Sequence, residues 1–272
     1  MSILEYYKYA QLATAAYVRL GNLSWDGETF AREARSNVQQ RLPESLAGYL
    51  FDPTSNTYGN HDVWNILYYY GGDNTSNPIA AADKSGFAAT LFRQGSNGEK
   101  VLAIRGTEPS EDGAVDLVGA DLGQIGVFGI ALTQVVSMVN LIQRLKAAEG
   151  THITQITVRA ELDRPNVGSY VTANGMTGQP IYLVFGTKDG LGEGEIHAGD
   201  QITLTGHSLG GELAVIAALL FPEVFGPRKD VFVYNSAGIN PGTADFLDLT
   251  KFLLPSGNAS IHEALASELG RR

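Results

Sequence analysis

The sequence contains no cysteine, which excludes disulfide bonds, thiolate-ligated zinc and a thiol nucleophile. Basic residues are also scarce, because 19 Lys and Arg stand against 29 Asp and Glu, for a formal net charge of −10. A nucleic-acid-binding protein usually presents a basic surface, so the composition argues against that class of partner.

Long apolar runs are missing as well. No run reaches the roughly 18 residues that a membrane-spanning helix needs, and the nearest one, residues 125–139, is interrupted by glycine and polar residues. The first residues show no basic segment followed by an apolar core, so no signal peptide is recognised. Localisation therefore stays open between the cytoplasm and export by a route that needs no signal peptide.

The residues that are abundant indicate a folded globular chain. Of the 272 residues, 44% are hydrophobic and 18% are charged, which is enough apolar material for a core. Glycine occurs 32 times and indicates many tight turns. We expect a single domain over residues 1–272, with a helical and irregular N-terminal region over residues 1–78.

Hydrophobic periodicity predicts helices and strands in alternation. Helices are expected over residues 3–20, 28–50, 127–148, 210–220, 244–254 and 261–269. Strands are expected over residues 86–92, 100–105, 201–205 and 230–235. Residues 51–78 look irregular, and residues 151–200 look like a β-rich insertion. Alternation of this kind predicts an α/β fold with a mostly parallel sheet and flanking helices.

One short motif points to chemistry. Gly206-His207-Ser208-Leu209-Gly210 stands between an apolar strand and an apolar helix. In a nucleophile elbow the serine occupies a sharp, strained turn, and side chains two positions before and after it would clash with the backbone. Ser208 is therefore a candidate nucleophile, and a structural Gly-Ser turn is the alternative interpretation.

A second motif would complete an oxyanion hole. Acyl transfer needs two N–H donors aimed at the developing oxyanion. One would come from Leu209, the residue after the candidate nucleophile, and the other from a loop that follows an earlier strand. Thr107 fits that second position, because a strand runs directly into Arg105-Gly106-Thr107. An ordinary strand-to-loop turn is the alternative here.

The two motifs together resemble the class 3 lipase family, in particular the bacterial lipase-like domains found in larger secreted proteins. The resemblance covers about residues 80–240. It implies an α/β-hydrolase fold, Ser208 as nucleophile, Thr107 as oxyanion residue and no metal or organic cofactor. It also implies that the chain is a lipase or esterase, which cleaves carboxylic esters of small molecules or lipids through an acyl-enzyme.

The general base and its acidic partner are less clear. A triad in the order serine, acid, histidine needs a histidine after Ser208, and only His262 meets that requirement. Asp245 is the matching acid candidate. The resembling family places two more strands before its acid and base, whereas this chain continues as helical sequence. Either Asp245 and His262 complete a compressed triad, or the sheet lacks its last strands and the acid and base lie outside this sequence.

Two other functions stay open. A phospholipase A1 would share the same catalytic motifs, and a catalytically silent, hydrolase-like interaction domain would explain the missing late strands. The apolar stretch over residues 125–141 is expected to pack in the core, with a lid or a transient lipid-interface contact as the alternative. The oligomeric state cannot be read from the sequence.

Overall fold

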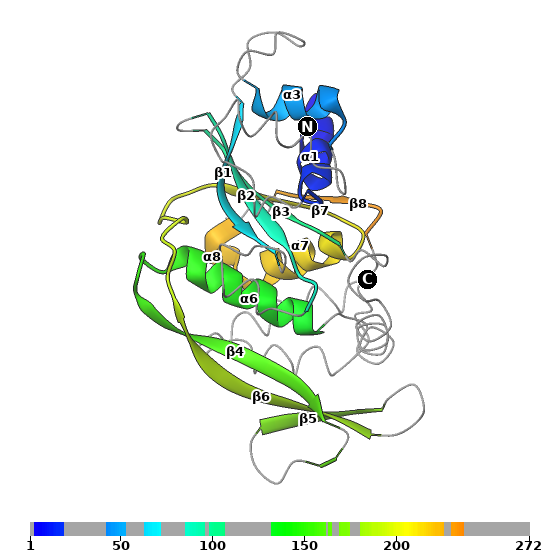
Figure 1. Cartoon of the computed structure of the whole chain (residues 1–272), viewed down its shortest axis with the longest axis vertical. Helices are drawn as coiled ribbons and strands as arrows, with labels where there is room; N and C mark the ends of the chain where they lie inside the picture. The colour runs from blue at the N-terminus through cyan, green and yellow to red at the C-terminus, as the bar shows by residue number, and fades with distance from the viewer. Residues whose placement is uncertain are drawn as a thin grey trace. The chain divides into compact units, whose positions relative to one another are not determined.

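The computed structural model divides into two compact units, residues 1–107 with 198–237 and residues 108–197 with 238–272 (Figure 1). Each unit is described by itself. The structure describes residues 3–18, 42–52, 63–71, 85–95, 98–106, 132–161, 163–164, 169–174, 180–225 and 230–236.

The first unit contains a five-stranded sheet in the order β1-β2-β3-β7-β8. Its strands are β1 (Trp64–Tyr70), β2 (Ala89–Gln94), β3 (Lys100–Ile104), β7 (Ile202–His207) and β8 (Val231–Tyr234). The first three strands pair antiparallel, while β3, β7 and β8 run parallel. The α/β class is thus confirmed, and the described sheet is mixed. The carboxyl ends of the three parallel strands meet at one edge.

Helices cover both faces of this sheet. Figure 1 shows α1 (Ile3–Ala15) and α3 (Glu44–Phe51) over one face and α7 (Leu209–Leu220) with α8 (Pro222–Phe225) over the other. The apolar composition of α7 suits this position, because a helix that is hydrophobic on most sides is stable only when buried. No helix in the described ranges is long and apolar enough to cross a membrane.

The core between α1, α3 and the sheet is rich in aromatic residues. The ring of Tyr9 stacks on Phe232 with centroids 3.9 Å apart, and Phe51 lies over Phe92 at 6.2 Å. Large buried side chains of this kind each contribute about 1.5–3 kcal/mol of burial free energy. Further members of this core are Leu12, Ala16, Val18, Leu50, Trp64, Tyr69, Val101 and Ala103.

A buried polar contact fixes α1 against the sheet. The carboxylate of Glu99 accepts hydrogen bonds from Lys8 Nζ at 2.7 Å, Tyr9 Oη at 2.6 Å and Thr203 Oγ1 at 2.7 Å. Burial, together with the Glu99 carboxylate, raises the pKa of the Tyr9 phenol, so the phenol remains a donor. The contact joins α1 to the start of both β3 and β7.

The second unit contains an antiparallel sheet in the order β4-β6-β5 and the helix α6 (Leu132–Lys146). Its strands are β4 (His152–Glu161), β5 (Ser169–Asn174) and β6 (Pro180–Leu191), all within the segment expected to be β-rich. The side-chain amide of Asn140 in α6 donates to the carbonyl of Ile156 and accepts from its N–H, both at 2.8 Å. This double hydrogen bond joins α6 to β4.

Several boundaries differ from the sequence predictions. The expectation of irregular structure is wrong for residues 64–70, which form β1 because a run of aromatic and β-branched side chains suits a half-buried strand. The first helix ends at Ala15 rather than near residue 20, and β7 extends to His207. The predicted helices over residues 244–254 and 261–269 lie outside the described residues, as does most of the stretch over residues 28–50.

Candidate active site

Ser208 occupies a strained turn between β7 and α7. Its backbone angles are φ 55° and ψ −129°, and among the described non-glycine residues only Asn235 also has a positive φ. Such a conformation costs roughly 1–3 kcal/mol, so it persists only where the surrounding structure enforces it. The N–H of Ser208 donates to the Tyr234 carbonyl at 3.0 Å, and its own carbonyl accepts from Gly211 N–H at 3.0 Å. The turn is therefore held from β8 and from the first turn of α7.

The glycines of the motif are required by backbone contacts. A Cβ atom on Gly206 would lie 2.3 Å from the carbonyl oxygen of Gly210. A Cβ atom on Gly210 would lie 2.2 Å from the carbonyl oxygen of Ile104, the last residue of β3. Neither neighbour can rotate away, because both are main-chain atoms. Any side chain at either position would therefore push α7 away from the ends of β3 and β7.

The end of β3 lies directly beside the candidate nucleophile. A Cβ atom on Gly106 would lie 2.7 Å from the His207 carbonyl oxygen and 3.3 Å from Ser208 Cβ. The next residue, Thr107, lies outside the described residues, so its oxyanion role stays a prediction. The arrangement nevertheless places the start of the predicted oxyanion loop against the turn that holds Ser208.

Leu209 is the first residue of α7, and its side chain is buried. The N–H groups in the first turn of a helix have no acceptor within the helix, and the dipole of the helix is positive at this end. The positive end of α7 therefore lies next to Ser208 in the chain, and the oxyanion role of Leu209 stays a prediction.

Tyr17 is a neighbour of the turn that sequence reasoning missed. Its hydroxyl lies 3.1 Å from His207 Nδ1 and 3.4 Å from the His207 carbonyl oxygen, and it accepts from Gly106 N–H at 3.2 Å. The Tyr17 and His207 rings meet edge-on, with centroids 5.9 Å apart. No motif surrounds Tyr17, and it is 190 positions from His207, so only the fold brings the two together.

Two buried ionisable side chains border the site. Glu212, in the first turn of α7, is 1% exposed, and its Oε1 has no hydrogen-bond partner among the described residues. Burial raises the pKa of Glu212 to about 8. Arg105, which directly follows β3, is 5% exposed, and within the same part of the chain its Nε has no hydrogen-bond partner either. Neither burial was predicted from the sequence.

The remaining predicted site residues are not brought together by the described structure. Asp245 and His262 lie outside the described residues, so their place in a triad stays a prediction. Two other histidines, His152 and His197, which are not among the predicted site residues, are exposed and belong to the second unit. Within the described ranges, no group of three or more His, Asp or Glu side chains could hold a metal ion.

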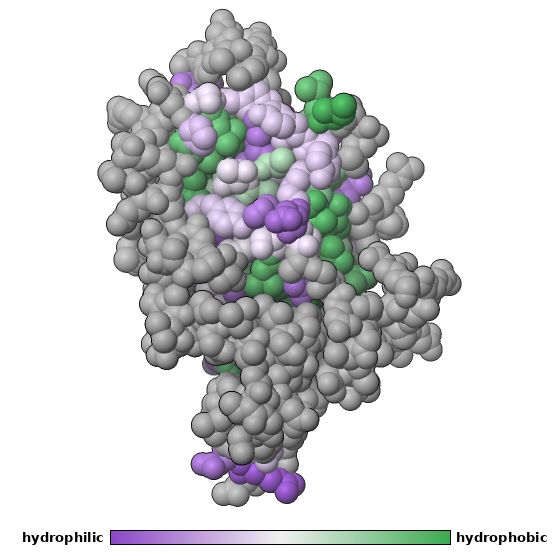
Figure 2. Space-filling view, turned by 90° about the vertical axis from the view of Figure 1, so that its right-hand side faces the viewer, coloured by the Kyte–Doolittle hydropathy of each residue, from purple (hydrophilic) through white to green (hydrophobic). Residues whose placement is uncertain are grey.

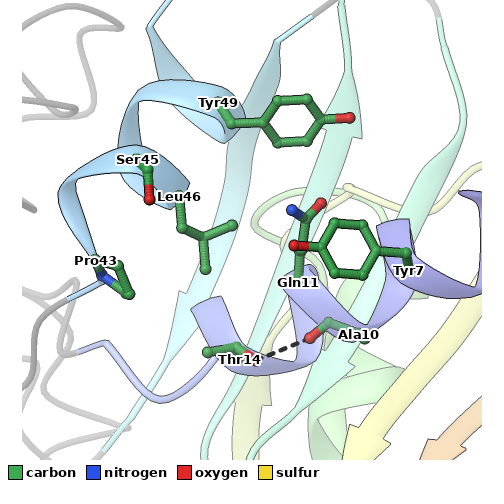
Figure 3. A pocket seen from close by; sticks show the side chains of 8 residues that line it. All are labelled: Tyr7, Ala10, Gln11, Thr14, Pro43, Ser45, Leu46 and Tyr49. Carbon is green, nitrogen blue, oxygen red and sulfur yellow. Dashed lines mark hydrogen bonds between the residues drawn. The ribbon is translucent and has the colours of Figure 1, made fainter. Parts of the chain in front are cut away.

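A separate groove lies between α1 and α3. Its volume is about 260 Å³, and Figure 3 shows Gln11 beside the ring of Tyr7 on α1, with the ring of Tyr49 from α3 above them. No residue of the Ser208 turn lines it. Four large side chains near the start of α1 are also exposed, namely Ile3, Leu4, Tyr6 and Tyr7. On the face seen in Figure 2, apolar and polar described residues are interspersed.

No family model matches the chain, and no curated protein or solved structure matches it either. The described structure is a mixed α/β fold with helices on both faces of its central sheet. Its most unusual described feature is a strained serine at the carboxyl edge of that sheet.

Proposed function

We propose that the chain is a serine hydrolase that cleaves carboxylic esters through an acyl-enzyme. The supporting observation is the positive φ of Ser208 in a turn that connects a parallel strand to a buried helix. Strained backbone of this kind is concentrated at functional sites. A Gly-Ser turn with a purely structural role could form without this strained backbone conformation.

In the proposed mechanism, Ser208 Oγ attacks the carbonyl carbon of the ester while a histidine base removes the hydroxyl proton. The carbonyl oxygen becomes an oxyanion and accepts hydrogen bonds from the N–H groups of Leu209 and Thr107. The intermediate then collapses, the protonated base donates its proton to the departing alkoxide, and the acyl group stays on Ser208. Water activated by the same base hydrolyses this acyl-enzyme. His262, oriented by Asp245, is the proposed base.

One observation favours a second candidate, a catalytically silent domain that binds a partner. Among the described residues, no imidazole nitrogen is hydrogen-bonded to Ser208 Oγ. The nearest histidine in sequence is His207, and Tyr17 contacts its Nδ1. A serine without a base would keep its strained backbone but would not attack an ester.

Labelling with a fluorophosphonate probe separates the two candidates, because the probe reacts only with an activated serine. We expect the wild-type chain to be labelled at Ser208 and to hydrolyse p-nitrophenyl butyrate, a long-chain ester or a phospholipid. Ser208→Ala should abolish labelling and lower turnover at least about 10³-fold. Ser45→Ala, on the surface of α3, is the matched control and should change neither. Labelling that survives Ser208→Ala would reject this nucleophile.

A further inference from the structure

Tyr17 projects from a fixed backbone. It lies in the turn that follows α1, where its N–H donates to the Thr14 carbonyl and the N–H of Val18 donates to the Ala15 carbonyl, both at 3.1 Å. The side chain of Val18 is buried in the aromatic core. A ring that leaves such a turn has few alternative positions, so its hydroxyl is held in place before any substrate arrives.

The helix that precedes this turn is itself attached to β7. Thr205 Oγ1 donates to the Tyr9 carbonyl at 3.1 Å and lies 3.0 Å from the Phe232 carbonyl. The helix before Tyr17 is therefore bonded directly to the strand that ends at His207.

The Tyr17 hydroxyl contacts the ends of two neighbouring strands. A phenol has one donor hydrogen and two acceptor lone pairs. One lone pair accepts a hydrogen bond at 3.2 Å from the N–H of Gly106, which is the second residue after β3. The hydroxyl also contacts His207, the last residue of β7, at Nδ1 and at the carbonyl oxygen. One side chain thus bridges the end of β3 and the residue before Ser208.

We propose that Tyr17 is a positioning residue for the hydrolase site. It sets the spacing between Gly106, which directly precedes the predicted oxyanion residue Thr107, and the turn that carries Ser208. An oxyanion hole works only when its donors lie within a few tenths of an ångström of the position that the oxyanion will occupy. This proposal rests on the proposed function, because spacing of this kind matters only where an oxyanion forms.

Tyr17→Phe tests the catalytic consequence, since it removes the hydroxyl and keeps the ring. We expect kcat for p-nitrophenyl butyrate to fall about tenfold while KM changes less than about twofold, because the lost contact acts on the transition state. The matched control is Tyr9→Phe, which removes another bonded hydroxyl from the α1 region but one that contacts Glu99. It should lower the melting temperature and leave kcat unchanged. An unchanged kcat in Tyr17→Phe, or equal losses in both variants, overturns the proposal.

Nuclear magnetic resonance tests the bridge independently of activity. In Tyr17→Phe the imidazole ¹⁵N signals of His207 and the amide signal of Gly106 should shift, while Tyr9→Phe should leave both in place. Unchanged signals in Tyr17→Phe overturn the bridge. If the wild-type chain hydrolyses no ester, the proposed function fails and the catalytic role of Tyr17 fails with it. Shifted signals in Tyr17→Phe would then still establish that the Tyr17 hydroxyl bridges Gly106 and His207, and the missing activity would have another cause.

Discussion

The Ser208 turn and the β4-β6-β5 sheet both contain tightly packed glycines, but the packing differs in kind. At Gly206 and Gly210 the nearest obstacles to a Cβ atom are main-chain atoms, such as the Ile104 carbonyl oxygen 2.2 Å from the Gly210 position. In the sheet of the second unit, the nearest atoms to a Cβ atom on Gly190 belong to the side chain of Gln155, at 2.6 Å. A side chain can change rotamer, whereas a strand end can move only with its sheet. The glycines around Ser208 are thus fixed by the architecture.

The Ser208 region and the second unit also differ in whether a buried ionisable side chain has a charged partner. Glu212 beside the turn is buried, and one of its carboxylate oxygens has no hydrogen-bond partner among the described residues. In the second unit, the buried guanidinium of Arg144 pairs with Glu193 and donates from Nε to the Leu191 carbonyl at 3.1 Å, although its Nη1 has no partner among the described residues. An ionisable group buried without a charged partner lowers stability in its charged form, while a paired one depends on its partner. The two regions therefore differ in that only Arg144 has a counter-charge within the described residues.

The largest expected effect comes from replacing Glu212, the buried carboxyl that distinguishes the Ser208 region from the second unit. Its carboxyl titrates near pH 4.5 in the unfolded chain, whereas in the folded chain burial raises the pKa of Glu212 to about 8. Between these values the folded state holds a proton that the unfolded state has lost, so stability falls as the pH rises, by about 1.4 kcal/mol per pH unit. Glu212→Gln should match the wild type near pH 4 and be more stable by about 5 kcal/mol above pH 8.

Urea denaturation at a series of pH values measures this difference. The free energies of unfolding of the wild type and Glu212→Gln should diverge as the pH rises from 4.5 to 8 and run parallel above it. Curves that stay parallel from pH 4 to pH 9 would mean that Glu212 ionises normally in the folded chain. Glu223→Gln, at an exposed position of α8, provides the control and should show no divergence.

The next largest effect is expected from alanine at two glycine positions, one blocked by main-chain atoms and the other by a side chain. Gly210→Ala should lower the free energy of unfolding by about 3 kcal/mol, because its Cβ must separate α7 from the end of β3. Gly190→Ala should lower it by less, about 2 kcal/mol, because its nearest obstacle is the buried side chain of Gln155 and not the main chain. Chemical denaturation of the two variants side by side gives both values. Equal losses would refute the distinction between main-chain and side-chain obstacles.

The smallest effect concerns the ion pair of the second unit. Glu193→Gln should cost about 2 kcal/mol of stability, because it leaves the Arg144 guanidinium buried without its counter-charge. Since Glu193 is partly exposed, the loss should shrink as salt is added. Asp189→Asn, exposed on β6 of the same sheet, should change stability by less than about 0.5 kcal/mol. Denaturation at 0.05 M and 1 M NaCl distinguishes the two variants.

The sequence predicted those features of the fold and the site that a few neighbouring residues encode. The pattern of Gly206, Ser208 and Gly210 encodes the turn within five residues, and the neighbouring apolar segments predicted the strand and the helix around it. The strand β1 was missed because its aromatic run lies among turn-forming residues. The burial of Glu212 was missed because a glutamate in the first turn of a helix normally faces water, whereas α7 is packed on nearly every side.

The contacts of α1 have a consequence for the order of folding. Tyr17 and His207 are 190 positions apart, and Tyr9 and Thr205 are 196 positions apart. Contacts of such high contact order carry a large loop-closure entropy and form late. The first helix is therefore synthesised almost two hundred residues before the strand to which it is bonded, and it can reach its final position only after that strand has formed.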